Sequence, residues 1–382
     1  MKKSSKIGLL TENDTKAAVP PHIKKAKIYD PPITNIAKYR LFMNENLFGP
    51  APHCIDRFKS FNKQDLLEYP YGGDSKLCSA LAAFYSISEN EVCLNHGSSE
   101  VLKQIFYMLL QRGDTVLLPC PGWGYYYALA QLVGAKSISY TLRMNQNSFE
   151  FDTKSIHDAF ATHHPKVVVI TSPNMPTGNL LPTHMLEYLL DTMPQTFFVI
   201  DEAYWGFDEN NNLNIKKYIK QYDNVIFVRT FSKFFALASE RIGYLIANYE
   251  LCTQLKKGAP LFGISFGAQQ TGIAALEATA YYDFIRKEYN KSKQLVSVLL
   301  NKTSELSVYI SSANFVLIKV LNGQAAALVA YVGKYGFAIR ECASYGLPSF
   351  VRVTVGSADL MTKLAGAINN FFENRKLSDA QY

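Results

Sequence analysis

The sequence of 382 residues has few cysteines, a modest share of charged residues and no long hydrophobic run. Charged side chains make up 19% and hydrophobic ones 48%, which excludes a disordered or fibrous chain and is typical of a globular protein. No apolar run approaches the ~18 residues that a membrane helix needs, and the apolar stretch at 7–10 is too short for a signal peptide. The six cysteines include no CxxC pair, which is typical of a reducing compartment. We therefore expect a cytoplasmic protein that does not cross a membrane.

Strong charge and metal-ligand clusters are also missing. The formal net charge is +7, and lysines gather only in the first 27 residues, where no arginine or aromatic residue interleaves them. This pattern is typical of a solvated segment and not of a nucleic-acid-binding arm. His163 and His164 are adjacent but have no cysteine or carboxylate at ligand spacing. We expect no nucleic-acid partner and no metal.

From residue 91 onward, short apolar segments alternate with helical patterns. The segments are apolar on both faces, which indicates a largely parallel sheet covered by helices on both sides, an α/β fold. The predicted strands are 91–94, 116–118, 137–140, 167–170, 197–200, 225–228 and 244–246, and helices are predicted at 123–133 and 183–191.

The chain is too long for one compact core and predicts one large and one small domain. Before residue 39 it is polar and interrupted by prolines, which predicts an extended or partly disordered lead-in to a short strand. A helix-rich stretch follows residue 267, and strands are predicted near 314–320 and 351–355. The predicted units are an N-terminal extension (1–45), a large α/β domain (46–295) and a small α+β C-terminal domain (296–382).

Lys233 is the last residue of the stretch Thr230-Phe231-Ser232-Lys233, which follows the buried strand predicted at 225–228. Burial disfavours the charged form of a lysine and lowers its pKa. A neutral amine is a nucleophile, and it can hold a carbonyl cofactor as a Schiff base. A lysine after a strand is also typical of a solvated loop, so this stretch alone leaves both interpretations open.

Further polar residues follow other predicted strands, and ligands bind outside the carboxyl ends of such strands. Ser98 and Ser99 stand at a strand-to-helix junction, where they can cap the helix or bind a phosphate. Asp201 and Tyr204 place a carboxylate and a phenol at another strand exit. Arg241 fits an anion site equally as well as a structural ion pair.

Together these groups match the needs of a phosphorylated pyridine aldehyde. A carboxylate can keep the pyridine nitrogen protonated, and a phenol can hold the ring oxygen. Helix amides, a hydroxyl and an arginine can hold the phosphate. Trp123 can stack on a flat ring, although it also fits a hydrophobic core.

From about Arg40 to its end, the sequence resembles the fold-type I pyridoxal-phosphate enzymes of the class I/II aminotransferase superfamily. Within that group it is most similar to the histidinol-phosphate aminotransferases. The resemblance rests on motifs that occur in the family's order: Asn44-Glu45-Asn46 with Gly49-Pro50, Tyr69-Pro70, Asp201-Glu202-Ala203-Tyr204, Thr230-Phe231-Ser232-Lys233, Arg241-Ile242-Gly243-Tyr244 and Arg352-Val353-Thr354-Val355-Gly356.

The resemblance implies a fold-type I architecture, pyridoxal 5'-phosphate as cofactor and a role for each matching residue. Lys233 would bind the cofactor and shuttle the proton, Asp201 would pair with the pyridine nitrogen, and Tyr204 would hold the ring oxygen. Trp123 would stack on the ring. The residues implied to hold the phosphate are Ser98, Ser99, Thr230, Ser232 and Arg241, together with Tyr69 from a neighbouring subunit.

That role of Tyr69 implies a homodimer with active sites at the subunit interface. Arg352 matches the residue that binds the substrate carboxylate or another anionic group, and Arg340 lies where the family often has a second anion contact. We therefore expect an anionic amino acid or keto acid as substrate.

The sequence departs from the family at the loop Ser172-Pro173-Asn174-Met175-Pro176-Thr177-Gly178. The family has an asparagine that donates to the ring oxygen where this chain has Met175, which cannot donate. Met175 is thus expected beside the cofactor, with Asn174 nearby as a substrate contact. The loss leaves Tyr204 as the main donor and raises the expected pKa of the Schiff base. Ser99 stands where relatives usually have aspartate.

The predicted function is an aminotransferase acting on an amino acid or a phosphorylated amine, similar to histidinol-phosphate aminotransferase. The alternative is a decarboxylase or another non-transaminating enzyme of a specialised biosynthetic pathway, because Lys233-Phe234-Phe235-Ala236-Leu237 resembles the phosphothreonine decarboxylases. The third class is a non-catalytic cofactor-binding or regulatory protein, and the presence of Lys233, Asp201, Tyr204 and Arg352 disfavours it.

Overall fold

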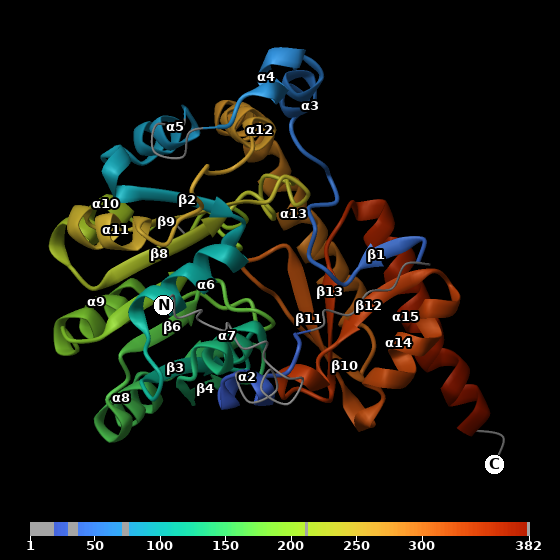
Figure 1. The fold of residues 1–382 in the computed structure, drawn as a ribbon. Coiled ribbons are helices and arrows are strands. Elements are labelled where there is room, and N and C mark those ends of the chain that lie inside the picture. The colour runs from blue at the N-terminus through green and yellow to red at the C-terminus, as the bar shows by residue number, and fades with distance from the viewer. Residues whose placement is uncertain (1–18, 30–36, 71–75, 211–212, 380–382) are drawn as a thin grey trace, which may run out of the picture.

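The computed structural model describes residues 19–29, 37–70, 76–210 and 213–379, and it contains two β-sheets with helices packed on them (Figure 1). Among these residues, no helix combines the length and the hydropathy needed to cross a membrane.

The larger sheet has eight strands, in the order β2 (Val92–His96), β9 (Ile242–Ile246), β8 (Val225–Thr230), β7 (Phe197–Asp201), β6 (Val167–Thr171), β3 (Thr115–Cys120), β4 (Lys136–Met144) and β5 (Phe149–Phe151). The run from β8 to β4 is parallel, whereas β9 is antiparallel to both of its neighbours and β5 is antiparallel to β4. The prediction of a largely parallel α/β sheet is confirmed. The chain reverses between β8 and β9 because residues 231–241 contain no crossover helix.

The central strands are apolar on both faces because each face is covered by its own hydrophobic layer. In β6, Val167 and Val169 join the layer that contains α6 and α7, while Val168 and Ile170 join the layer on the opposite face. The helices of this part are α3 (Pro52–Lys59), α4 (Lys63–Leu67), α5 (Lys76–Tyr85), α6 (Ser98–Leu109), α7 (Tyr125–Val133), α8 (Thr153–His163), α9 (Thr183–Thr192), α10 (Ile215–Gln221), α11 (Tyr249–Lys256) and α12 (Phe266–Glu277).

The second sheet has five strands, in the order β1 (Tyr39–Leu41), β12 (Phe337–Glu341), β13 (Phe350–Thr354), β11 (Phe315–Val320) and β10 (Leu306–Tyr309). Only β1 and β12 pair in parallel; the other pairs are antiparallel. The helices beside this sheet in Figure 1 are α13 (Thr279–Leu300), α14 (Ala325–Lys334) and α15 (Ala358–Asp379).

The elements agree with the predicted ones along most of the chain, with the following differences. The lead-in was expected to be extended, but Pro21–Lys25 form helix α2. Strands β5, β10 and β12 were not predicted. Strand β1 lies in the predicted N-terminal extension but pairs with β12, and α13 crosses the predicted limit at residue 295. The domain boundaries remain a prediction.

Candidate active site

A cavity of about 460 Å³ is lined by residues from both sheets, at the carboxyl ends of the parallel strands. Most of the site residues predicted from the sequence meet there. They are Ser98, Ser99, Trp123, Met175, Asp201, Tyr204, Thr230, Ser232, Lys233, Arg241, Arg340 and Arg352.

Lys233 lies in the loop after β8, and its side chain reaches the cavity. Its Nζ donates a hydrogen bond of 2.7 Å to the carbonyl oxygen of Met43. Burial, and then the positive charge of Arg352, lower the pKa of this amine to about 8. The amine therefore loses its proton near pH 8, and the neutral form is the one that attacks an aldehyde.

Asp201 is the last residue of β7 and is buried. The hydroxyl of Tyr126 donates to Asp201 Oδ2 at 2.6 Å, and the amide of Ala203 donates to Oδ1 at 3.0 Å. Thr171 shares a hydrogen bond of 2.8 Å with the same tyrosine hydroxyl. Burial outweighs these donors and raises the pKa of Asp201 to about 6. A carboxylate with this pKa can share a proton with a pyridine nitrogen.

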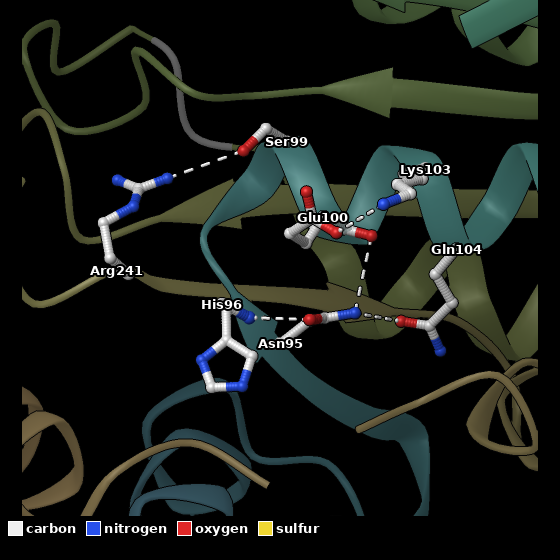
Figure 2. Close-up of polar contacts among 7 residues, drawn as sticks. All are labelled: Asn95, His96, Ser99, Glu100, Lys103, Gln104 and Arg241. Atoms are coloured by element: carbon white, nitrogen blue, oxygen red, sulfur yellow. Dashed lines mark hydrogen bonds and ion pairs between the residues drawn. The ribbon is translucent and has the colours of Figure 1, made fainter. Parts of the chain in front are cut away.

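The turn between β2 and α6 forms a cradle with Arg241. The N-cap of α6 is Gly97, with φ of 85° and no side-chain cap, so the first helix amides are open to a ligand. A Cβ atom at Gly97 would lie 2.3 Å from Arg241 Nη2, and one at Gly243 would lie 2.3 Å from the Ser98 amide. Glycine at both positions lets the backbone and the guanidinium approach closely. Figure 2 shows Arg241 pointing at Ser99, whose Oγ lies 3.5 Å from Nη2.

Side chains behind the cradle fasten α6 to β2. Asn95 Nδ2 donates to Gln104 Oε1 at 2.8 Å and to the Glu100 carbonyl at 3.4 Å (Figure 2). Gln104 also donates to the Leu255 carbonyl at 2.7 Å. These buried bonds hold the helix terminus in place relative to the sheet.

Two hydroxyls complete the cradle on the side of β8. Thr230 Oγ1 donates its one proton to the Ile242 carbonyl at 2.9 Å, and it accepts from Ser232 Oγ, which lies 2.9 Å away. Arg241 Nη1 donates to Ser232 Oγ at 3.2 Å and to the Ala238 carbonyl at 2.9 Å. Open amides, hydroxyls and a guanidinium are the donor set that phosphate prefers.

Tyr204 and Met175 lie together in a small buried cluster beside the cavity. Burial raises the pKa of Tyr204 to about 12, although Arg352 and the hydrogen bond from Asn44 oppose the rise. Asn44 Nδ2 donates to the Tyr204 hydroxyl at 2.9 Å. Met175 Sδ accepts from Arg352 Nη1 at 2.7 Å.

Two arginines face the cavity from the second sheet. Arg352 on β13 is buried, and its Nη2 donates to the Phe42 carbonyl. The guanidinium of Arg340 on β12 lies 5.6 Å from the ring centre of Tyr345, and that of Arg352 lies 5.9 Å from the same ring. Nε of each arginine is buried without a hydrogen-bond partner in the part of the chain that the structure describes. The pair is suited to an anionic group of a ligand.

The comparisons with known proteins agree with this geometry. The sequence model of the family described as aminotransferase class I and II matches residues 37–368. The chain belongs to this aminotransferase family.

Two relatives of this aminotransferase are both named histidinol-phosphate aminotransferase. It is 31% identical over 329 residues to histidinol-phosphate aminotransferase 2 of Archaeoglobus fulgidus, covering 86% of this chain and 91% of that one. It is 32% identical to the histidinol-phosphate aminotransferase of Anoxybacillus flavithermus, covering 93% and 96%. The resemblance to this branch of the aminotransferases is confirmed.

Solved structures confirm the fold-type I architecture. Histidinol-phosphate aminotransferase from Sinorhizobium meliloti, solved with pyridoxal-5'-phosphate, superposes with a TM-score of 0.83 at 23% identity, covering 93% of this chain and 98% of that one. L-threonine-O-3-phosphate decarboxylase from Porphyromonas gingivalis superposes with a TM-score of 0.77 at 22% identity, covering 88% and 99%.

Two predicted site residues of this aminotransferase do not line the cavity. Asn174 is fully buried, and its Nδ2 donates to the Pro121 carbonyl at 3.1 Å and to Thr177 Oγ1 at 2.7 Å. Its amide fastens the loop, and Met175 faces the cavity instead. Tyr69 is exposed, and its ring stacks on Phe262 with centres 4.4 Å apart.

Several side chains at the site of the aminotransferase were not predicted. Tyr126 stands in the first turn of α7, three residues after Trp123, and its hydrogen bond to Asp201 was not predicted. Tyr29 accepts a hydrogen bond of 2.8 Å from Trp123 Nε1 and also lines the cavity. Asn44 was noticed only as part of a motif, and no sequence pattern pointed to Tyr345.

Proposed function

We propose that this chain is a pyridoxal-phosphate-dependent aminotransferase that moves an amino group between an anionic amino acid, or a phosphorylated amine, and a keto acid or aldehyde. The observation that carries the proposal is that a low-pKa lysine, a buried carboxylate and a phosphate cradle face one cavity. When bound, pyridoxal phosphate supplies an aldehyde carbon and an electron-accepting pyridine ring.

The residues present fit this group. Gly97 opens a space that a side chain would fill, and the cradle offers amide, hydroxyl and guanidinium donors. Asp201 would hold the pyridine nitrogen, Tyr204 the ring oxygen, and Trp123 the ring face. The phosphate would be held by the amides of Ser98 and Ser99, the hydroxyls of Thr230 and Ser232, and Arg241.

Lys233 would serve as nucleophile and as proton carrier. Its amine, with a pKa of about 8, would be the neutral nucleophile that holds the aldehyde of the cofactor. The same Nζ would also accept and return the proton of substrate Cα. The carbonyl of Met43, 2.7 Å from Nζ, holds the amine at the cavity.

Arg352 and Arg340 would select an anionic substrate. Arg352 is buried, so its charge is poorly screened by solvent, and its Nε is free to donate within the described residues. A carboxylate or phosphate on the substrate can satisfy both guanidinium groups.

A homodimer is part of the proposal. Large apolar side chains with exposed fractions from 46 to 85% occur on α3, on α4 and in the residues after them, and near residue 261; they are Phe58, Leu66, Leu67, Tyr69, Leu261 and Phe262. A second copy of the chain would cover them and would bring Tyr69 to its neighbour's phosphate cradle. Sedimentation should give a dimer, and the double variant Leu66→Asp/Leu67→Asp should shift it toward monomer. A wild-type monomer would contradict the shared site.

The free cysteines fit a cytoplasmic location.

The experiment is a spectral titration of the protein with pyridoxal phosphate and then with amino donors that carry a carboxylate or a phosphate. We expect a visible absorption band that Lys233→Ala abolishes. Conversion of this band by a donor, together with a keto acid or aldehyde product, supports transamination. Release of carbon dioxide with survival of the band would instead establish the predicted alternative, decarboxylation. No band at all would refute both.

A further inference from the structure

We propose that Asn44 is a positioning residue that aims the hydroxyl proton of Tyr204 into the cavity, so that this phenol acts as the donor to the cofactor's ring oxygen. The inference rests on the proposed function. It concerns a side chain that does not line the cavity and acts through Tyr204, which does.

The donor and acceptor groups around the Tyr204 hydroxyl provide the first argument. A phenol has one proton to donate and lone pairs that accept. Asn44 Nδ2, at 2.9 Å, can only donate, so it occupies a lone pair and leaves the proton to point elsewhere. Among the described residues, no acceptor bonds this proton. Because Tyr204 lines the cavity, the proton is available to a ligand there.

The orientation of the Asn44 amide is fixed by its other neighbour, Thr354 on β13. The backbone amide of Asn44 donates to Thr354 Oγ1 at 3.0 Å, which leaves the threonine proton free. That proton is donated to Asn44 Oδ1 at 3.2 Å. Oδ1 therefore faces Thr354 and Nδ2 faces Tyr204. In the reversed orientation the Thr354 hydroxyl would accept from Nδ2, and its own buried proton would lose Oδ1 as acceptor.

The backbone at Asn44 explains why asparagine occupies this position. Its φ is 56°, in the left-handed region that asparagine tolerates better than most residues. The residue is fully buried, and its carbonyl accepts from Asn314 Nδ2 at 3.0 Å. A strained, fully bonded conformation that presents a donor to an active-site phenol is typical of a functional constraint.

Met175 makes the direction of the Tyr204 proton more important. A thioether offers no proton, and here its sulfur accepts from Arg352 at 2.7 Å. With no amide donor at position 175, Tyr204 is the side chain in this cluster that is left to donate to the ring oxygen. If Asn44 is lost, the phenolic proton is no longer directed to the cavity.

The test measures the pH midpoint of the visible band that bound pyridoxal phosphate forms with Lys233. In Asn44→Asp, a carboxylate accepts the Tyr204 proton and draws it away from the cavity, while the side-chain shape and the tolerance of positive φ are kept. We expect the midpoint to rise by about one pH unit, as loss of a charge-assisted hydrogen bond implies. If the aspartate variant does not fold, Asn44→Gly replaces it, because glycine keeps the backbone conformation and removes only the side-chain amide. This variant should give a smaller rise in the midpoint.

Rescue and a matched control separate positioning from simple destabilisation. Adding Met175→Asn to Asn44→Asp restores a donor beside the ring oxygen and should lower the midpoint again. Asn46→Asp is the control, since Asn46 is buried and donates to the Phe234 carbonyl at 2.7 Å without contacting Tyr204. It should lower stability and leave the midpoint where it is.

An unchanged midpoint in both Asn44 variants, or an equal rise in Asn46→Asp, would overturn the inference while the proposed function stands. Absence of any band from the wild-type protein would overturn the proposed function, and the inference with it.

Discussion

Asp201 is a buried carboxylate whose burial costs stability in the cofactor-free protein, and Asp201→Asn should recover that stability. Asparagine imitates the protonated acid. Its Oδ1 can accept from the Ala203 amide as Asp201 Oδ1 does at 3.0 Å, and its Nδ2 can donate to the Tyr126 hydroxyl. Tyr126 can then donate to Thr171, with which it already shares a hydrogen bond of 2.8 Å. No buried polar atom of this group loses its partner.

The magnitude follows from the pKa of Asp201, which burial raises from 3.8 to about 6. A raised carboxyl pKa means that the folded state binds the proton more tightly. The free energy of unfolding therefore falls as the pH rises from 3.8 to about 6, and the full loss is present above that range. The difference corresponds to about 3 kcal/mol at about pH 7.5 and falls to about 1 kcal/mol near pH 4.5. Asp201→Asn should raise the free energy of unfolding by these amounts, and it should weaken cofactor binding.

The assay is urea denaturation of the cofactor-free protein at both pH values, with Glu202→Gln as the matched control. Glu202 is the adjacent buried carboxylate, but it forms an ion pair of 2.8 Å with Arg229, which is only 3% exposed. Removing one partner of such a pair costs about 3–5 kcal/mol, so the control should have the opposite sign.

If Asp201→Asn raised the free energy of unfolding by the same amount at both pH values, the electrostatic explanation would be refuted, because an effect of packing does not depend on pH. A loss of stability near pH 7.5 would refute the assignment of the cost to burial of charge. A lower free energy of unfolding in Glu202→Gln, together with a higher one in Asp201→Asn, would support both explanations: the cost of burying the Asp201 charge and the stabilising ion pair of Glu202.

Two further variants test the cavity. Gly97→Ala places a Cβ atom 2.3 Å from Arg241 Nη2 at a φ of 85°, so calorimetry should show weaker binding of inorganic phosphate and chemical denaturation a loss of about 1–3 kcal/mol. Arg352→Gln removes a buried guanidinium, and steady-state kinetics should show KM for anionic amino donors rising by about tenfold or more, as loss of a charge-assisted hydrogen bond implies. Uncharged donors should be affected little; an equal effect on both would contradict the anion site.

Local patterns made most of the fold predictable. Strands such as β6 and β8 are apolar on both faces, so their burial in a parallel sheet follows from the sequence. Residues at the exits of neighbouring parallel strands, including Asp201 and Lys233, had to lie at one edge of the sheet.

Contacts between distant segments and one-residue shifts within a loop were not predictable in this way. The pairing of β1 with β12 and the bond from Asn44 to Tyr204 join parts of the chain that no local pattern connects. Asn174 was expected to face the substrate, but hydrogen bonds to Pro121 and Thr177 turn its side chain into the loop. Only the packed structure decides which of two adjacent side chains faces a cavity.

The central claim is that the cavity, and not low lysine pKa alone, selects the lysine that binds the cofactor. Lys293 offers the comparison: burial also lowers its pKa to about 8, but it donates to the Ser311 carbonyl outside the cavity. The protein would be mixed with pyridoxal phosphate, reduced with borohydride, digested and analysed by mass spectrometry. We expect a stoichiometric label on Lys233 and none on Lys293. A label on Lys293 or on exposed lysines, with Lys233 unmodified, would contradict it.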